Sequence, residues 1–478
     1  MKKLLRILAV ISLASVLAAC GDVSTPNEET TFDFDWHAEN PFYGETLTVA
    51  TAFNFNIRRF AQAYMQANPG VTIELIDYSR DAARREEGRE EIGLQLMTGD
   101  APIMFADFFV NYLNADVARM LADWRPIMNS DPNFIEEDWF MAPFDAMAVD
   151  GRLLSFPFEI RYTLLSANTT IPGMTEALEG RTGITYAEAL QIYLDLGGPE
   201  MGMFMDDNFN VNQAVQLNLS QFLDIPTRHV DFVNDEFIDL ITTARRHTDP
   251  ANNFDWVMSN VVDLRQIEED SRHYFFRRDN VLNMSIYNIF ETENPFGITL
   301  PFVNAHDEVM IIPFQGFVLN AGATPAQQAL AMDFIRFMMI VPPLDPNLPD
   351  DAQDPQIVGR RGLQHGMWLM LPLHRSFLEF SVGNNHQSLI RWNFTWGNGW
   401  RLRDGMRLVE EWHLLSEIIL EPMQAWGDMP MARSNTAPGF VVDAIEEILR
   451  QFHDGLITAE AAANDLQNRI TLILMEMS

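Results

Sequence analysis

Strand-type and helix-type segments alternate along residues 47–106, and this alternation constrains the fold more than any other feature of the sequence. Residues 47–52 and 71–76 alternate in the manner of β-strands, and residues 103–106 show a third, shorter strand pattern. Apolar residues recur at helical spacing over 57–64, and a charged helix is expected over 81–97. Strands separated by helices predict a parallel sheet covered by helices, so we predict an α/β fold.

The C-terminal third of the sequence also contains clear helix boundaries. Thr324-Pro325 predicts a helix start, because a proline in the first turn removes no amide donor that the helix needs, and Pro342-Pro343 predicts its end. Two further helices are expected near the C-terminus. The first presents an apolar face over 441–452, and the second is capped by Thr458.

The segment ISLASVLAACGD, residues 11–22, contains the one cysteine of the sequence, Cys20. A basic start and an apolar run over 4–16 precede it, and this run is too short to span a bilayer as a permanent helix. Leu-Ala-Ala-Cys at 17–20 resembles the lipobox of bacterial lipoproteins, which implies cleavage before Cys20 and lipid on its thiol. We therefore expect a signal peptide at 1–19, a flexible tether at 20–44, and an exported protein anchored by lipid to the outer face of the cell membrane. A plain secretory peptide with an incidental cysteine is the alternative.

Acidic residues outnumber basic ones by 67 to 32. Both lysines, Lys2 and Lys3, lie in the signal segment, so every later positive charge is an arginine. Such a surface repels nucleic acid and anionic lipid head groups, and neither is expected as a partner. The charge is either a solubility feature of an exported protein or an acidic docking surface. With a single cysteine, the chain can form neither an internal disulfide nor a cysteine-based zinc site.

Six segments, in their order along the chain, resemble the extracellular solute-binding proteins of ABC importers, the family that includes the maltose-type sugar binders. The matching segments are residues 68–74, 98–105, 150–157, 309–339, 362–372 and 454–462. The resemblance implies a two-lobed, type II-like periplasmic-binding-protein fold, in which each lobe is a mixed, mostly parallel sheet flanked by helices, with hinge crossovers between the lobes. It places residues 45–157 and about 300–345 in lobe 1, and about 158–299 and 346–478 in lobe 2.

The resemblance also implies a function. A monomeric protein without cofactor or catalytic residues would capture an extracellular solute, above all a carbohydrate, between its lobes and deliver it to the membrane permease. Aromatic rings stack on the apolar faces of sugars, and polar side chains bind their hydroxyl edges. The candidate ligand-binding residues are Phe53, Asn54, Phe55, Asp107, Phe108, Arg161, Tyr162, Ser285, Tyr287, Asn288, Gln315, Phe317, Trp392 and Trp396.

Several of these candidates have an equally plain structural alternative. Residues 53–55 follow the first strand at the sheet edge where ligands of open α/β folds bind, but their phenylalanines also suit a core. Asp107 can accept a sugar hydroxyl or cap the next helix. Arg161 can contact the ligand or form a surface salt bridge, and at least one of the tryptophans near 392–400 is expected in the core.

Two other classes of protein remain open at this point. A lipoprotein glycosidase needs two carboxylates, and the sequence has so many that their number decides nothing. A surface adhesin would use the same tether. The sequence lacks Gly-x-Ser-x-Gly and His-Glu-x-x-His motifs, and after residue 19 it has no lysine for a phosphate loop. Asp-Pro-Asn at 131–133 and 345–347 hints at calcium but lacks the ligand pattern of an EF-hand, so no metal site is predicted.

Overall fold

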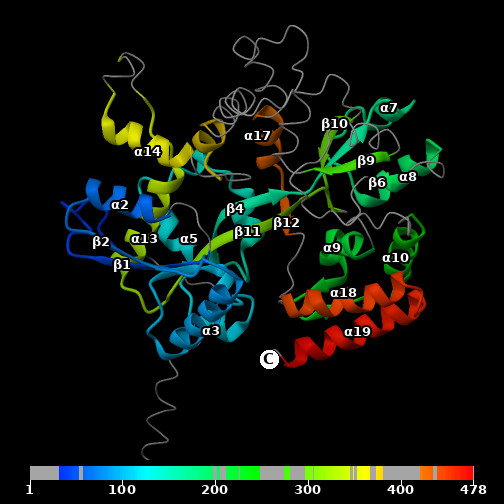
Figure 1. The fold of residues 1–478 in the computed structure, drawn as a ribbon, viewed down its shortest axis with the longest axis horizontal. Coiled ribbons are helices and arrows are strands. Elements are labelled where there is room, and N and C mark those ends of the chain that lie inside the picture. Colours follow the sequence, from blue (N-terminus) through cyan, green and yellow to red (C-terminus); the bar gives the residue numbers. More distant parts are fainter. Residues whose placement is uncertain are drawn as a thin grey trace, which may run out of the picture.

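The computed structural model describes residues 32–52, 57–197, 202–204, 211–225, 227–247, 274–279, 296–304, 306–344, 348, 353–365, 373–380, 420–433 and 439–476. Within these residues the chain forms two lobes, each with its own sheet and helices, and long strands run from one lobe to the other (Figure 1). The fold is α/β, as the alternation of strands and helices predicted, and both larger sheets are mixed.

The sheet of lobe 1 contains the three strands predicted at residues 47–106. β1 (Thr46–Thr51) pairs in parallel with β2 (Thr72–Asp77) and with β3 (Met104–Ala106). β11 (Val309–Leu319) pairs antiparallel with β3 and with β4 (Ser155–Tyr162), and in parallel with the short β12 (Met431–Arg433). The strand order is β12-β11-β3-β1-β2, with β4 also on β11.

Capping residues set the helix boundaries of lobe 1. α2 (Ile57–Ala67) follows β1, and α3 (Ala82–Thr98) follows β2. The Asp81 side chain accepts from the Arg84 amide at the start of α3, and Gly99 ends the helix at φ 84°. α13 (Pro325–Met339) begins with a capping box at Thr324, which confirms the predicted start. The other described helices here are η1 (Asp107–Phe109), α4 (Ala115–Arg119), α5 (Trp124–Ser130), η2 (Glu136–Asp138), α6 (Ala142–Met147), α14 (Pro355–His365) and α17 (Glu421–Gly427).

The sheet of lobe 2 pairs differently. β5 (Leu164–Asn168) pairs antiparallel with β10 (Phe296–Pro301) and β9 (Tyr274–Asp279), and β6 (Gly202–Phe204) pairs in parallel with β9. The described part of this sheet is thus more antiparallel than the resemblance implied. The reason is that β9 and β10 return alongside β5 and do not follow it in the same direction.

Helices complete lobe 2, and two of them come from the C-terminal end of the chain. The described helices are α7 (Met174–Leu178), α8 (Tyr186–Asp195), α9 (Val211–Phe222), α10 (Asp235–His247), α18 (Gly439–His453) and α19 (Ala459–Glu476). A small hairpin, β7 (Leu223–Asp224) and β8 (His229–Val230), follows α9. The Thr458 hydroxyl accepts from the Ala461 amide at 3.2 Å, so the predicted cap of the last helix is confirmed.

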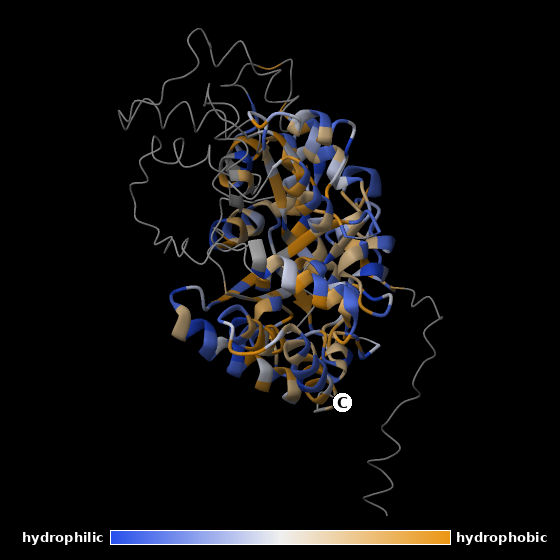
Figure 2. Ribbon diagram, turned by 90° about the vertical axis from the view of Figure 1, so that its right-hand side faces the viewer, coloured by the Kyte–Doolittle hydropathy of each residue, from blue (hydrophilic) through white to orange (hydrophobic). Residues whose placement is uncertain are grey.

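Each lobe has its own hydrophobic core, and the chain crosses between lobes where neighbouring residues change core. Leu164 packs in the first core and Leu165 in the second. On β11, Ile311 packs in the first core and Met310 in the second. On β12, Met431 packs in the first core and the next residue packs against the second. Figure 2 shows hydrophobic strands in the interior, with most hydrophilic residues on the surrounding helices.

These cores divide the chain at other points than the sequence-based boundaries did. The first crossing lies at residues 164 and 165, beyond the expected boundary at 157 and 158. Within the stretch 346–478, which was assigned to lobe 2, Leu373, Phe377, Met423 and Trp426 pack in the first core. Among the described residues of this stretch, α18 and α19 supply the side chains of the second core. The chain therefore crosses a third time, at β12.

The end of the segment assigned to the tether packs on lobe 1. The rings of Phe34 and Phe42 stack at 5.6 Å, and Phe34 meets Trp36 edge-to-face at 5.0 Å. The Trp36 indole also donates to the Ser130 hydroxyl at 3.2 Å, and Phe42 is buried in the first core. Residues 32–44 are thus part of the folded lobe, because their aromatic side chains bury apolar surface that an acidic spacer lacks.

Candidate ligand-binding site

The candidate site follows one edge of β11, at the point where this strand passes between the lobes (Figure 1). β4 and its continuation occupy the other edge, since the Thr163 amide donates to the Met310 carbonyl at 3.4 Å. On the site edge, β12 pairs with residues 309–311 and β3 with residues 317–319. No strand of the described chain covers residues 312–316 on this edge, which we call the uncovered segment. Its backbone groups need partners other than a strand.

Asp107 lies at one end of the uncovered segment. It directly follows β3, and its carboxylate accepts from the Gly316 amide and from Ser155 Oγ, the latter at 2.9 Å. A Cβ on residue 316 would lie 2.5 Å from Asp107 Oδ2, so only glycine lets the carboxylate reach the strand. Burial raises the pKa of Asp107, and its hydrogen-bond donors and Arg433 act against that increase. The residue as a whole is partly buried.

Arg433 lies at the other end, as the last residue of β12. It is 8% exposed, and one terminal nitrogen donates to the Tyr112 hydroxyl. Its guanidinium carbon lies 5.4 Å from the centroid of the same ring. Burial raises the pKa of Tyr112, Arg433 lowers it and Asp107 raises it, so the three groups lie within electrostatic reach of one another. In the described structure, Arg433 Nε has no hydrogen-bond partner.

Gln315 and Phe317 were both predicted as ligand contacts, and both lie on β11. Gln315 belongs to the uncovered segment; its side chain is buried, and Oε1 has no partner among the described residues. Phe317 is 3% exposed and meets Phe158 edge-to-face at 5.5 Å. Its carbonyl accepts from the Trp124 indole at 3.0 Å. Gln315 therefore lies at the site, whereas the Phe317 ring lies in the first core.

Arg161 and Tyr162 lie at the end of β4, beside the crossing. Tyr162 and the other even-numbered residues of β4 pack in the first core, so Arg161 belongs to the opposite face, together with Ser155. Arg161 lies six positions along the strand from Ser155, a distance of about 20 Å. Arg161 and Asp107 therefore lie on the same face of β4 but near opposite ends of this strand.

The Tyr162 ring faces the core and meets Trp426 of α17 edge-to-face at 5.9 Å. Burial, reinforced by the charge of Asp428, raises the pKa of Tyr162 well above its ordinary value. Its hydroxyl has no hydrogen-bond partner among the described residues. Tyr162 thus connects the first crossing to the helix that precedes the third.

Phe108 is directed toward α3. The guanidinium carbon of Arg89 lies 4.3 Å from the centroid of its ring, and Phe109 meets it edge-to-face at 5.8 Å. The ring is half-buried. Its neighbours are therefore side chains of lobe 1.

The remaining candidates lie outside the described residues. They are Phe53, Asn54, Phe55, Ser285, Tyr287, Asn288, Trp392, Trp396 and the lipidation candidate Cys20. Residues 345–347, the second Asp-Pro-Asn stretch, lie outside them as well.

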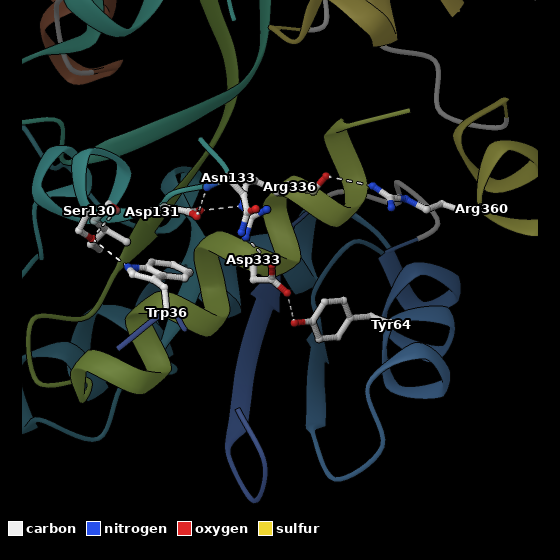
Figure 3. Close-up of polar contacts among 9 residues, drawn as sticks. Trp36, Tyr64, Ser130, Asp131, Asn133, Asp333, Arg336 and Arg360 are labelled. Carbon is white, nitrogen blue, oxygen red and sulfur yellow. Dashed lines mark hydrogen bonds and ion pairs between the residues drawn. The ribbon is translucent and has the colours of Figure 1, made fainter. Parts of the chain in front are cut away.

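A second buried arginine cluster lies wholly within lobe 1 (Figure 3). Arg336 of α13 forms ion pairs with Asp131 at 2.7 Å and with Asp333 at 2.5 Å, and the Tyr64 hydroxyl donates to Asp333. The Asp131 carboxylate also accepts from the Asn133 amide at 2.9 Å. The carboxylate of the first Asp-Pro-Asn stretch, Asp131, is thus paired with Arg336. Among the described residues, no three His, Cys, Asp or Glu side chains gather in a way that could hold a metal ion.

No sequence motif pointed to Tyr112, Ser155 or Arg433. Ser155 falls inside a segment that carries the family resemblance, so its position was visible but its partner was not. Arg433 and Tyr112 are 321 residues apart, and neither belongs to a recognisable motif. The only local signal for Arg433 was a short strand-type stretch before the terminal helices.

No protein-family model matches this sequence, and no curated protein matches it either. Solved structures do match. The sugar-binding protein MalE from Xanthomonas citri is 13% identical, with 90% of this chain and 98% of that chain covered and a TM-score of 0.57.

Two further structures match over similar lengths. A family 1 extracellular solute-binding protein from Alicyclobacillus acidocaldarius is 11% identical, with 90% and 99% covered and a TM-score of 0.52. The cyclic alpha-maltosyl-1,6-maltose binding protein from Arthrobacter globiformis is 14% identical, with 90% and 99% covered and a TM-score of 0.51. As predicted, the chain therefore has the two-lobed, periplasmic-binding-protein-like fold that these binding proteins share.

Proposed function

We propose that the protein is the solute-binding lipoprotein of an ABC importer, which captures an extracellular carbohydrate between its lobes and delivers it to the membrane permease. The observation that carries this proposal is the uncovered segment of β11 at the junction of the lobes. Asp107, Gln315 and Arg433 provide a carboxylate, an amide and a guanidinium along it. Sugar hydroxyls donate and accept, so one ligand can bind all three groups.

The arrangement of the crossings suits a hinge. β4, β11 and β12 link two lobes whose hydrophobic cores are separate, so the lobes can rotate without exposing either core. A ligand favours closure only through contacts that are better in the closed form. Asp107 comes from lobe 1 and Arg433 from the third crossing, so a ligand that binds both lies where the two lobes meet.

We propose that residues from both lobes complete the site. Residues 53–55 come directly after β1, which is parallel to β3, and Asp107 comes directly after β3. Carboxyl ends of parallel strands lie at the same sheet edge, where ligands of open α/β folds bind. Arg161 at the first crossing remains a candidate, as do Tyr287 and Trp396.

Export and lipid anchoring form the second part of the proposal. No helix in the described part of the chain is long and apolar enough to cross a membrane. Lipid on Cys20 would attach the protein to the outer face of the membrane, with the packed residues 32–44 at the start of lobe 1. In the producing cell, Cys20→Ala is expected to move the protein from the membrane fraction to the soluble fraction. Unchanged membrane attachment would contradict this part.

Ligand binding without turnover is the central test. Mono- and oligosaccharides are screened by thermal shift of the purified protein, with product analysis of every mixture. A ligand at a hundred times its dissociation constant stabilises the native state by about 2.7 kcal/mol, which gives a clear increase in melting temperature. Polyamines and short peptides serve as controls from other solute classes. Stabilisation by a sugar that is recovered intact supports the proposal, whereas hydrolysis of the sugar would support a glycosidase.

A further inference from the structure

Arg433 is buried beyond what its structural contacts explain. It is 8% exposed, one terminal nitrogen donates to Tyr112, and its Nε has no hydrogen-bond partner in the described structure. A buried donor without an acceptor destabilises the native state, and more so when it is charged. A charged donor of this kind, at the end of the uncovered segment, lacks an acceptor that a ligand can supply.

The nearby carboxylate does not fill this role. Asp107 already accepts from Ser155 Oγ at 2.9 Å and from the Gly316 and Phe108 amides. Asp107 and Arg433 interact through their charges, since Arg433 lowers the pKa of Asp107 against the effect of burial. The two charges offset each other, and a ligand at the uncovered segment meets a pair that is neutral as a whole.

This balance selects against anions. A ligand carboxylate near Arg433 would also lie near the negative charge of Asp107, and like charges at such distances repel in a partly buried site. A hydroxyl oxygen accepts from Nε–H without that repulsion, and its proton remains free to reach an acceptor such as Gln315 Oε1, which has no partner in the described residues.

We infer that Arg433 is a specificity-determining residue of the junction site, which donates from Nε to a hydroxyl of a neutral polyhydroxylated ligand, while Asp107 excludes sugar acids. This inference rests on the proposed function. It adds that Arg433 binds the ligand through Nε and that the ligand is uncharged. Arginine suits the role because its planar guanidinium can bind Tyr112 and a ligand at once, which the single ammonium of lysine cannot do in the same geometry.

The test compares three variants by calorimetric titration with maltose, maltotriose and glucuronic acid. Arg433→Lys keeps the charge and removes the Nε donor, so we expect at least tenfold weaker binding of the neutral sugar. Arg433→Gln removes the charge as well and is expected to lose at least as much affinity. Asp107→Asn leaves Arg433 unbalanced and is expected to bind glucuronic acid at least fivefold more tightly than the unaltered protein does.

Arg119→Gln is the matched control, because Arg119 pairs with Asp116 at 3.2 Å on the surface, with 76% of its side chain exposed. It should leave every affinity unchanged. Melting temperatures without ligand show whether each variant is folded, and Arg433→Lys serves if Arg433→Gln does not fold. Neutral-sugar binding by Arg433→Lys within twofold of the unaltered protein overturns the inference, as does unchanged glucuronate binding by Asp107→Asn. If no sugar binds the unaltered protein, the proposed function itself fails.

Discussion

Two buried arginines of this protein, Arg336 and Arg433, have similar neighbours but different roles. Arg336 lies inside lobe 1 with two aspartates, one of which accepts from a tyrosine hydroxyl (Figure 3). Arg433 lies at the lobe junction with one aspartate in electrostatic reach and a tyrosine that accepts from it. Both side chains are largely withdrawn from solvent, and both tie together segments far apart in the chain.

The difference lies in what each cluster leaves without a partner. Arg336 faces two carboxylates, and the Arg360 guanidinium donates to its carbonyl at 3.3 Å, so the cluster joins α13, α5, α2 and α14 into one lobe. Arg336 Nε has the Asp131 carboxylate at 2.7 Å, whereas Arg433 Nε, at the uncovered segment, has neither a hydrogen-bond partner nor an ion-pair partner among the described residues. The comparison indicates that a buried arginine with carboxylates on both sides stabilises a lobe, whereas one that keeps an unused donor at a hinge is available to a ligand.

The largest expected effect comes from breaking the cluster in lobe 1. In Arg336→Met, the fully buried Asp131 side chain loses its counter-charge. We expect the free energy of unfolding to fall by about 3–5 kcal/mol, the usual cost of leaving one partner of a buried pair alone. Denaturant unfolding measures it, with the exposed Arg119→Met as a control expected within about 0.5 kcal/mol of the unaltered protein. A loss below 1 kcal/mol would contradict the structural role of Arg336.

A fall in pH is a second way to distinguish the stability of lobe 1 from ligand binding, because His374 of lobe 1 titrates. Burial lowers the pKa of His374 to about 4 from its ordinary 6.5, Arg360 lowers it further, and Asp138 acts against both. Because the folded pKa lies below the unfolded pKa, the stabilising contribution of neutral His374 is complete above pH 6.5 and is lost as pH falls toward 4. The total corresponds to about 3 kcal/mol.

The measurement compares the unaltered protein with His374→Gln by denaturant unfolding between pH 7.5 and 4.5. The stability of the unaltered protein should fall more steeply in this range, by up to about 2–3 kcal/mol. Parallel curves for the two proteins would show that folding does not lower the pKa of His374. Sugar affinity at pH 6.5 to 7.5 should be the same in both, because the His374 ring contacts Trp139 and Ser376, which lie in lobe 1.

Gly316→Ala is expected to disturb the group at the lobe junction, which consists of Asp107, Tyr112 and Arg433. The new Cβ would lie 2.2 Å from Ser155 Oγ and 2.5 Å from Asp107 Oδ2, so the carboxylate must move away from the strand. We expect a stability loss of about 2 kcal/mol, typical of overpacking, together with weaker sugar binding. Gly93→Ala in α3 is the control: a Cβ there meets nothing within 4 Å, and alanine favours the helix, so its stability should increase slightly. Unchanged sugar affinity in Gly316→Ala would show that Asp107 does not contact the ligand.

The smallest expected losses of stability come from removing the two tyrosine hydroxyls. These two variants compare the Arg336 and Arg433 clusters most directly. Tyr64→Phe removes the donor to Asp333 and should cost about 1.5 kcal/mol in unfolding, with no change in sugar affinity. Tyr112→Phe removes the acceptor of Arg433 and should cost about 1 kcal/mol or less, with a measurable change in affinity. Equal affinity changes in the two variants would show that the clusters do not differ in function.

Local segments of the structure followed from the sequence because their signals are local. The strands at 46–51, 72–77 and 104–106, the capping box at Thr324 and the cap at Thr458 depend on residues within a few positions of one another. Asp107 was predicted for the site because it follows a strand, and its position needed no distant partner. The aromatic residues at 34, 36 and 42 were visible too, but the acidic composition around them concealed that they pack.

Only the tertiary structure determined which distant segments of the chain contact one another. The sequence determined an α/β chain with an N-terminal segment of secretion type, a strong negative charge and the segment order of a two-lobed binding protein. It did not determine that β12 forms a third crossing, that residues 373–378 pack in the first core, or that Arg433 meets Tyr112. Hydrogen bonds and buried contacts between segments hundreds of residues apart depend on how the two cores close, and no local pattern encodes that closure.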